Sequence, residues 1–542
     1  MKLQKLAGGA VVFLLIFLPA CKVVVNVPEG GKVTYQDGID YCLAGEKCIL
    51  DVSDVFFDET FVAVPAEGYR FTGWQKGRRG IFGNSTDNGI RLFTSNFVVD
   101  NRLLAILDMD VELYLEPVFN IAPIVTRLDI DLSAQAHVIS PLIFGDQNGW
   151  TNNGNFLYHI DSLSPDPDMM ALLKEARPTV IRYPEGTYSD FFHWQEAVGP
   201  VADRIPQIDP LSSVYGTLAK QVPYYGPDEY ALLTQELGAQ MLVTVNAGTG
   251  TAAEAAAWLS YYKNQNIHAK YWEIGNELYY LSEDYSYSTA TVYKTALEYA
   301  AIFDEFSSAL RAIDPSIEIG VLGVNNYPLF QLTPEADWNR FVLQNINEKA
   351  DFLAVHNVYA PISLFYDDDS KKVFQSLLAA PEVFKESFAD FVSDIETYAS
   401  PLNSDIKLAV TEHAPFFING DSDPMLQAKQ LEYNRTLASA LFSALTFNVF
   451  VSEPRIKIAA HLKMNGVWFQ ALVQRDVKDF SSAPYRSAYF YVFSLYRESA
   501  GGRYVPVKIQ ESPTYDAPAY GEYVARDQVD CLDAVSVVTE GT

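Results

Sequence analysis

Two glutamates stand where a run of β-forming residues ends. Glu277 closes the segment "KYWEIGNE", directly after Asn276, and Glu412 closes the segment "KLAVTE". Such runs of β-forming residues are typical of buried strands, and the glutamates stand where these strands would open into a loop. A carboxylic acid and a carboxylate on the two sides of a bond can donate a proton and attack as a nucleophile. We therefore predict that Glu277 and Glu412 are the catalytic pair.

Cleavage of a glycosidic bond is the reaction that such a pair supports. One carboxyl group protonates the leaving oxygen while the other attacks the anomeric carbon. The amide of Asn276 could bind a substrate hydroxyl beside the reacting carbon, a contact that strengthens in the transition state. The two glutamates are 412 − 277 = 135 residues apart in the sequence, so the fold must bring them together.

Eight strand-like runs alternate with amphipathic helical runs from about residue 141 onward. The runs are "LIFGD", "TVIRYP", "QMLVTVN", "AKYWEIG", "IEIGVL", "DFLAVHN", "IKLAVTE" and "IKIAAHLK". This alternation predicts an α/β fold, a (β/α)₈ TIM barrel. No strand is followed by a dinucleotide or phosphate-loop motif. Glu277 and Glu412 follow the fourth and seventh strands, at the barrel end where catalytic residues sit.

The first residues have the pattern of a targeting signal. Lys2 and Lys5 precede the apolar run "AGGAVVFLLIFL", which ends at "LPAC". The pattern resembles a bacterial lipoprotein signal and predicts cleavage before Cys21 with a lipid on its thiol. It predicts an exported protein, lipid-anchored to the bacterial membrane at the cell surface or in the periplasm. In an exported protein Cys42 and Cys48, which flank a Gly-containing turn, could form a disulfide.

The composition limits the partners. The 542 residues include 39 basic and 68 acidic residues, a formal net charge of −29. This charge repels nucleic acid and anionic lipid, so membrane contact is expected only through the N-terminal lipid. The 7 histidines form no ligand-spaced cluster and no Cys-x-x-Cys pair is present, so neither a metal nor another cofactor is expected. An uncharged oligosaccharide or polysaccharide is the expected partner, and the oligomeric state stays open.

The central segment resembles a known family. "YYGPDEYALLTQELGAQMLVTVNAGTGTAAEAAAWLSYYKN" followed by "KYWEIGNE" is similar to glycoside hydrolase family 51, the α-L-arabinofuranosidases, in a clan of (β/α)₈-barrel retaining glycosidases. "VIRYPEGTYSDFFHW" and "AVHNVY" also resemble segments of that family. The resemblance implies Glu277 as acid/base and Glu412 as nucleophile. It also implies substrate-binding roles for the residues Asn276, Arg182, His356 and Tyr359, and we add Trp194 and Asn246 as candidates.

The chain departs from the family pattern at two places. Glu185 replaces the first glycine after Pro184, and "HAPFF" follows Glu412 where the family usually has Trp-Asn. Both lie at the expected sugar-binding rim. They leave open other specificities on the same barrel, such as β-xylosidase, β-glucuronidase or agar-type galactanase. A further alternative is a non-catalytic glycan-binding surface lipoprotein, although the two intact glutamates argue against it.

The predicted domain order follows from these patterns. Short alternating runs over residues 22–119, including "EGYRFTGW", resemble a repeat of bacterial surface proteins and predict a small all-β domain after a signal peptide over residues 1–21. Residues 120–136 are expected to form a linker and, by the family resemblance, the first strand of a sandwich. Residues 137–500 are expected to form the catalytic barrel. Residues 501–542 are expected to form a partial C-terminal β-sandwich.

Overall fold

A computed structural model represents the chain. It describes residues 21–35, 41–52, 57–77, 80–83, 85–93, 111–122, 126–134, 136–214, 217–281, 289–325, 334–364, 369–419, 429, 431–466, 469–476, 479, 481–520 and 525–539. The chain forms two compact units, residues 1–125 and 126–542. The signal-like segment before Cys21 lies outside the described residues.

The first unit is made of short β-strands. They form three sheets with the strand orders β4-β1-β8, β3-β2-β5-β7 and β6-β9. The strands are β1 (Cys21–Asn26), β2 (Gly31–Tyr35), β3 (Tyr41–Cys42), β4 (Lys47–Val52), β5 (Asp58–Pro65), β6 (Tyr69–Trp74), β7 (Gly89–Phe93), β8 (Glu112–Leu115) and β9 (Pro117–Ile121). Trp74 of the "GYRFTGW" segment is buried, and its indole N–H donates to the carbonyl of Asp87 at 2.9 Å. Its ring is therefore a core residue of this unit.

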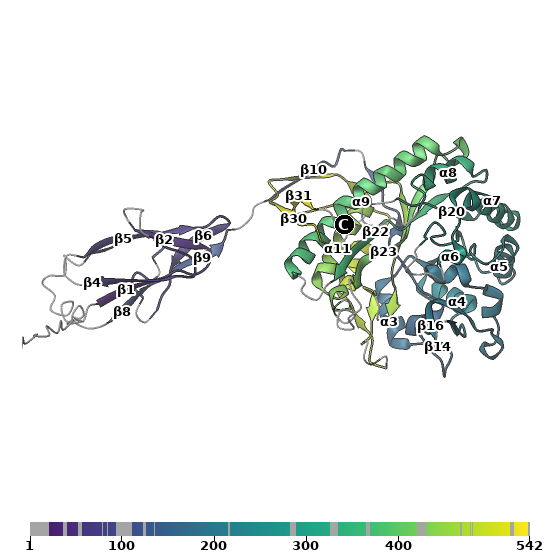
Figure 1. Cartoon of the computed structure of the whole chain (residues 1–542), viewed down its shortest axis with the longest axis horizontal. Coiled ribbons are helices and arrows are strands. Elements are labelled where there is room, and N and C mark those ends of the chain that lie inside the picture. The colour runs from purple at the N-terminus through teal and green to yellow at the C-terminus, as the bar shows by residue number, and fades with distance from the viewer. Residues whose placement is uncertain are drawn as a thin grey trace, which may run out of the picture. The chain divides into compact units, whose positions relative to one another are not determined.

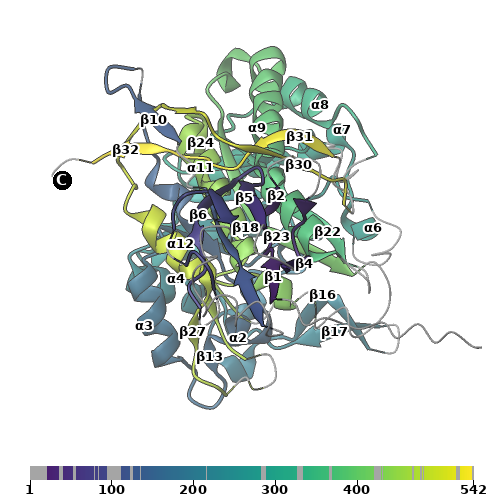
Figure 2. The same ribbon diagram turned by 90° about the vertical axis from the view of Figure 1, so that its left-hand side faces the viewer.

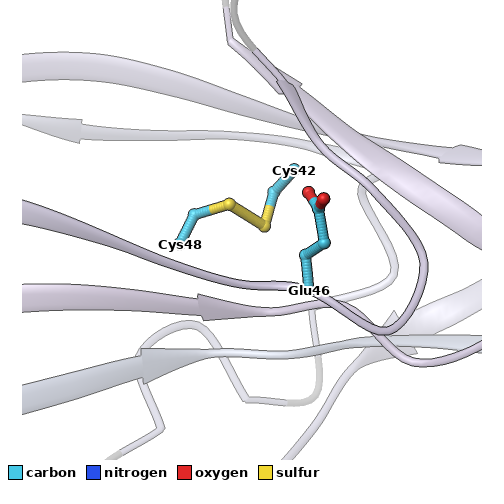
Figure 3. Close-up of side chains that lie close together, drawn as sticks. All are labelled: Cys42, Glu46 and Cys48. Carbon is cyan, nitrogen blue, oxygen red and sulfur yellow. A yellow bond between two sulfur atoms is a disulfide. The ribbon is translucent and has the colours of Figure 1, made fainter.

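The cysteines of this unit lie in or beside its core. Cys42 and Cys48 are joined in a disulfide next to the side chain of Glu46 (Figure 3). Cys21 begins β1, and only 2% of its surface is exposed. Because burial disfavours the charged thiolate, the pKa of the Cys21 thiol is raised. The residue expected to carry a lipid is thus packed in the core of the unit.

The second unit contains a closed barrel of eight parallel strands, which confirms the predicted fold. Each strand pairs with the next, and the last pairs with the first. In order they are β12 (Gly145–Gln147), β15 (Val180–Tyr183), β18 (Gln240–Val245), β19 (Tyr271–Ile274), β20 (Glu318–Leu322), β21 (Phe352–Val355), β23 (Lys407–Asn419) and β24 (Ile456–His461). Each overlaps the run predicted for it, although β12 begins later and β23 ends later than predicted.

The first barrel strand differs in detail from its prediction. "LIFGD" was expected to be extended, but Pro141–Ile143 forms a 3₁₀ turn. Ser140 starts this turn, because its hydroxyl oxygen accepts from the N–H of Leu142 at 3.3 Å. The strand therefore begins later, at Gly145. This shift places Gln147 at the mouth end of β12.

Helices surround the barrel (Figure 1). They are α3 (Pro167–Ala176), α4 (Pro227–Leu237), α5 (Ala252–Asn264), α6 (Thr289–Val292), α7 (Ala296–Ile313), α8 (Trp338–Asn345), α9 (Ser370–Tyr398), α11 (Leu437–Ser452) and α12 (Ala488–Arg497). Most begin with a side-chain cap; Thr251, for example, accepts from the N–H of Glu254 at 3.2 Å. Such caps fix the residue at which each of these helices begins.

Two further strand features extend the barrel mouth. β22 (Val358–Leu364) runs parallel to the second half of β23, from Val358 opposite His413 onward. β16 (Gln207–Val214) and β17 (Thr217–Gln221) form a hairpin between the second and third barrel strands. Such loops after the carboxyl ends of barrel strands commonly shape the substrate site.

The last part of the chain forms short strands with residues that precede the barrel. β10 (Arg127–Ile130) pairs with β29 (Val507–Gln510), and β11 (His137–Val138) pairs with β28 (Arg503–Val505), which also pairs with β32 (Ser536–Val538). β30 (Thr514–Ala517) and β31 (Arg526–Asp530) form a hairpin beside α9 (Figure 2). The residues before the barrel and after it thus share sheets, as a sandwich would require.

Within the described ranges, every helix is too short or too polar to span a lipid bilayer.

A buried histidine gives the second unit a pH-dependent stability. His413 packs against Phe447 and Phe450, and burial lowers its pKa from 6.5 to about 3. The unfolded chain takes up a proton below about pH 6.5, whereas the folded chain does not until about pH 3. The free energy of unfolding should therefore fall as pH drops through this window, by about 1.4 kcal/mol per pH unit for this group.

The variant His413→Phe is expected to remove that contribution from the pH dependence. Denaturant unfolding at a series of pH values from 7 to 4 measures it. An unchanged dependence in His413→Phe would contradict the assignment. His461, whose ring lies 5.1 Å from that of His413 and whose pKa is also lowered by burial, should retain its own share in the variant.

Candidate active site

Glu277 lies three residues beyond the end of β19. The chain leaves the strand through Gly275, whose φ is +76°, and reaches Glu277 with φ of +46°. A left-handed conformation at a residue other than glycine is strained, and such strain is concentrated at functional sites. The turn directs the Glu277 side chain into a position where 21% of its surface is exposed. The expected strand-end position of this glutamate is thus observed.

Glu412 lies inside β23, whereas the sequence predicted the strand to end there. The pairing of β23 with β24 shifts between Val410 and His413, and the strand then continues alongside β22. A bulge of this kind re-aims the side chains near it. The Glu412 side chain is 9% exposed. Pairing with β22, which the local sequence does not reveal, explains the longer strand.

The two carboxyl groups lie close together. One oxygen of Glu277, one oxygen of Glu412 and one ring nitrogen of His356 all lie within 4.8 Å of one another. Carboxyl groups about 5–5.5 Å apart fit direct nucleophilic attack, whereas about 6.5–9.5 Å leaves room for an intervening water. The observed separation therefore fits attack by a carboxylate.

Arg182 on β15 links the nucleophile candidate to the barrel interior. Its Nη1 donates to Glu412 Oε1 at 2.6 Å and its Nη2 to Asn276 Oδ1 at 2.7 Å. Burial would lower the pKa of Arg182, but the carboxylates of Glu273 and Glu412 outweigh it and raise that pKa. Because Arg182 occupies the amide oxygen of Asn276, the amide Nδ2 is left to donate to a substrate.

Tyr359 fixes the other oxygen of Glu412. Its hydroxyl donates to Glu412 Oε2. Burial raises the pKa of Tyr359, and the nearby carboxylates of Glu412 and Glu277 raise it further, so the phenol keeps its proton. Tyr359 belongs to β22, after the chain has left β21. Both oxygens of Glu412 are thereby oriented by donors from different strands.

A proton lies between a ring nitrogen of His356 and the carboxyl group of Glu277. Thr411 Oγ1 donates its hydrogen to Glu273 Oε1 at 2.6 Å, so His356 Nε2, 2.9 Å from that hydroxyl, must carry a hydrogen and donate it. His356 Nδ1 lies 2.8 Å from Glu277 Oε1. Two lone pairs would repel at this distance, so a proton lies between them.

The environment favours the charged form of His356. Burial lowers its pKa, but the carboxylates of Glu412 and Glu277 outweigh this and raise the pKa of His356 above its ordinary value. The contact therefore keeps a proton within reach of Glu277. This is the proton that a general acid at Glu277 must supply.

Glu273 is a site residue that we did not predict from the sequence. Its Oε2 accepts from Arg182 Nε at 2.7 Å and from Thr244 Oγ1 at 2.6 Å, and it is fully buried. It balances the charge of Arg182 beneath the reacting groups. A single carboxylate inside the apolar strand "YWEI" was the sequence signal, because a buried charge needs a partner.

Asp190 supports Asn276 from below. The backbone N–H of Asn276 donates to Asp190 Oδ2 at 3.1 Å. Burial raises the pKa of Asp190 well above its ordinary range. The sequence did not single out this residue, which lies in the 3₁₀ turn Thr187–Phe191 after β15.

Two predicted substrate contacts have structural partners in the fold. Trp194 stacks on Trp258 with ring centroids 6.0 Å apart, and its Nε1 donates to the carbonyl of Glu254 at 2.9 Å. Asn246 Oδ1 accepts from the N–H groups of Thr249 at 2.8 Å and Gly250 at 2.9 Å. Among the described contacts, these side chains hold a loop and a helix of the barrel and do not meet the carboxyl pair.

The spacing of Glu277, His356 and Glu412 would also suit a metal ion. Both ring nitrogens of His356 are, however, engaged with Glu277 and Thr411. An ion would have to displace the proton between His356 and Glu277. The hydrogen bonds therefore fit acid–base chemistry better than ligation.

Curated α-L-arabinofuranosidases are similar to the chain. An intracellular exo-α-(1→5)-L-arabinofuranosidase from Streptomyces lividans is 24% identical over 391 residues, which cover 68% of this chain and 55% of that enzyme. One of the same description from Acetivibrio thermocellus is 23% identical over 406 residues, covering 69% of this chain and 73% of that enzyme. The match thus spans about half the length of the Streptomyces enzyme. No protein-family model matches the chain.

These relatives correct the predicted location. Enzymes from Streptomyces lividans, Acetivibrio thermocellus, Halalkalibacterium halodurans and Bacillus subtilis are named intracellular. The prediction of an exported protein, lipid-anchored to a bacterial membrane, is therefore wrong. The burial of Cys21 in the first unit agrees with this correction.

Solved structures share the barrel fold. The α-L-arabinofuranosidase from Thermotoga maritima, in complex with arabinose, aligns with a TM-score of 0.62 at 20% identity over 77% of this chain and 83% of that one. A family 51 α-L-arabinofuranosidase from Thermotoga petrophila aligns with a TM-score of 0.60 at 20% identity, with the same coverage. The chain is thus similar in sequence to α-L-arabinofuranosidases and shares the fold of glycoside hydrolase family 51.

Proposed function

We propose that the chain is a retaining, exo-acting glycoside hydrolase that releases terminal α-L-arabinofuranosyl units from oligosaccharides. The observation that carries the proposal is the approach of the Glu277 and Glu412 carboxyl oxygens within 4.8 Å, because this spacing suits double displacement. The names of the curated relatives support the sugar and the exo mode.

In the first step Glu412 attacks the anomeric carbon. Arg182 and Tyr359 donate to its two oxygens and hold the side chain in one orientation. The bond to the leaving oxygen breaks as Glu277 gives that oxygen a proton. A covalent glycosyl ester on Glu412 results, and the leaving group departs as an alcohol.

In the second step Glu277 accepts a proton from water, which attacks the same carbon and breaks the ester. His356 helps here, because the proton between its Nδ1 and Glu277 can move within a 2.8 Å contact. Two inversions give net retention. The chemistry uses residues of the second unit only, and all of them lie in the proposed catalytic barrel, residues 137–500.

Wild-type enzyme should hydrolyse 4-nitrophenyl α-L-arabinofuranoside with retention of configuration. The measurement is release of nitrophenol across a panel of aryl glycosides, with proton NMR of the first sugar anomer formed. Appearance of the inverted anomer would exclude the double displacement. Failure to cleave any glycoside would favour the non-catalytic, glycan-binding alternative.

Another sugar specificity on this barrel is the second candidate. It is favoured by Glu185, which stands where the resembled family has glycine and directly precedes Gly186, where an added Cβ would lie 2.9 Å from Glu412 Oε1. The aryl β-D-xyloside, β-D-glucuronide and β-D-galactoside of the same panel test it. Preference for one of these by at least tenfold in kcat/KM over the arabinofuranoside would replace the proposed substrate.

A further inference from the structure

Glu185 and Lys463 form a buried ion pair that the proposed mechanism does not use. Lys463 Nζ lies 2.9 Å from Glu185 Oε1, and the two side chains are only 9% and 4% exposed. Glu185 has φ of +84°, a strained conformation for a residue with a side chain. Removing a charged pair from water is costly, and a well-packed apolar pair of similar volume is often as stable or more stable. Stability alone does not account for this pair.

A turn of unusual conformation supports the pair. Residues 152–155 all have φ between +48° and +71°. Left-handed backbone costs about 1–2 kcal/mol per residue other than glycine, although asparagine tolerates it better than most. The turn presents Asn155, whose Nδ2 donates to Glu185 Oε2 at 3.2 Å and whose Oδ1 accepts from Lys463 Nζ at 3.1 Å. Three distant segments thus converge on one polar cluster.

Contacts connect this cluster to the nucleophile on one side. A Cβ placed on Gly186, the residue after Glu185, would lie 2.9 Å from Glu412 Oε1. The backbone beside Glu185 therefore borders the reacting carboxylate. A Cβ on Gly149 would lie 1.8 Å from Glu185 Oε2, so the Glu185 carboxylate packs directly against the backbone of Gly149.

Aromatic rings connect the cluster to the nucleophile on the other side. Tyr359, which donates to Glu412, packs against Phe416 at 5.7 Å between ring centroids, and Phe416 stacks on Phe469 at 5.7 Å. Lys463 Nζ lies 6.0 Å from the centroid of the Phe469 ring. These contacts link Lys463 to the tyrosine that orients Glu412, and the side chains of Lys463 and Glu412 are equally exposed, at 9% each.

Two unused donors lie in these networks. Gln147 Nε2 and Asn148 Nδ2 are buried and have no hydrogen-bond partner among the described residues. Asn148 Oδ1 accepts from Asn155 at 3.2 Å, and Gln147 Oε1 accepts from Arg182 at 3.2 Å, so the two amides belong to the ion-pair cluster and the nucleophile network respectively. Buried donors normally have partners, and these two point to a ligand with several oxygens.

We infer that Glu185 and Lys463 determine substrate specificity by binding hydroxyl groups of the reacting sugar other than the one that Asn276 faces. This inference rests on the proposed function. The pair carries no net charge, so it offers no excess positive charge to a sugar carboxylate, and an uncharged sugar fits it best. A carboxylate accepts hydroxyl hydrogens and an ammonium group donates to hydroxyl oxygens, which suits neighbouring hydroxyls.

The test combines a variant with altered substrates. Glu185→Gln keeps the shape of the side chain but removes its charge. It should lower kcat/KM for 4-nitrophenyl α-L-arabinofuranoside by about 30- to 100-fold, the usual effect of a hydrogen bond to a charged group. The 3-deoxy or the 5-deoxy analogue, whichever lacks the bound hydroxyl, should already be a poor substrate of the wild type. On that analogue Glu185→Gln should cause less than threefold further loss.

The matched control is the exposed pair of Lys174 and Glu236, whose charged atoms lie 2.7 Å apart. Glu236→Gln should leave kcat/KM unchanged for every substrate. If Glu185→Gln does not fold, the double variant Glu185→Gln/Lys463→Met leaves no unpaired charge and takes the same test. Equal losses on the parent sugar and on both deoxy analogues would show a purely structural pair and overturn the inference.

A binding measurement separates this inference from the proposed function. Calorimetry with L-arabinose should show binding to the wild type and at least tenfold weaker binding to Glu185→Gln. This measurement does not require turnover. If the panel of aryl glycosides shows that the enzyme prefers another sugar, that free sugar replaces L-arabinose in the calorimetry. Equal affinity of both proteins, or no binding of any neutral sugar by the wild type, would overturn the inference.

Discussion

Glu412→Ala is expected to abolish hydrolysis of every aryl glycoside, with kcat lower by roughly 10⁴-fold or more. The side chain supplies the atom that attacks the anomeric carbon, and a better leaving group cannot replace that atom. Arg182 and Tyr359 would also lose the carboxylate that they orient. Initial rates with 4-nitrophenyl and 2,4-dinitrophenyl α-L-arabinofuranosides measure the loss.

Added azide should identify the missing role. In Glu412→Ala an azide ion can enter the space of the lost carboxylate and attack the sugar once, giving a glycosyl azide of inverted configuration. Glu236→Ala, at an exposed carboxylate on α4, is the control and should keep wild-type rates. Near wild-type activity of Glu412→Ala would show that the nucleophile is another residue.

Glu277→Ala should have an effect that depends on the leaving group. A dinitrophenolate leaves without a proton, so the first step is spared, whereas substrates with poor leaving groups should lose about 10²- to 10⁴-fold in kcat/KM. The glycosyl ester on Glu412 should then accumulate, because no base activates water. A burst of dinitrophenol followed by slow turnover measures this accumulation.

Azide should again separate the roles. In Glu277→Ala it attacks the glycosyl ester, so turnover of the dinitrophenyl substrate should rise and the glycosyl azide should have retained configuration. The limb of the pH–rate profile that reports the general acid should also disappear. Equal losses for good and poor leaving groups, with no effect of azide, would contradict the acid/base assignment.

The sequence alone determined the barrel and its two glutamates. Apolar runs such as "QMLVTVN" alternate with capped amphipathic helices, and this local pattern is enough to predict parallel strands. Glu277 could be placed at a strand end because Gly275 and Asn276 break the strand beside it. Strand ends of this kind can be predicted because the residues that determine them are close in the sequence.

Patterns near the N-terminus led to an error. The apolar run before "LPAC" resembles an export signal, yet Cys21 is a buried residue of β1 and several relatives are named intracellular. A short motif carries no information about whether its cysteine is accessible. Packing against other strands of the unit decides that.

Only the tertiary structure decided which side chains meet. Glu273, Thr411 and Arg182 come from three strands, and barrel closure brings them within hydrogen-bonding distance. Trp194 and Asn246 have types suited to sugar binding, but their partners in neighbouring segments use them for packing and loop capping. Residue type indicates what a side chain can do, whereas its neighbours determine what it does.

The pair of Glu185 and Lys463 shows most clearly that the sequence does not reveal which distant side chains meet. The sequence marked Glu185 as a departure from a family pattern but gave no sign of Lys463, which is 463 − 185 = 278 residues away. The two meet because β15 and β24 both pair with β12, so the segments that follow these strands emerge at the same barrel mouth. Contacts between residues so distant in sequence follow from how the barrel closes, and no local periodicity encodes them.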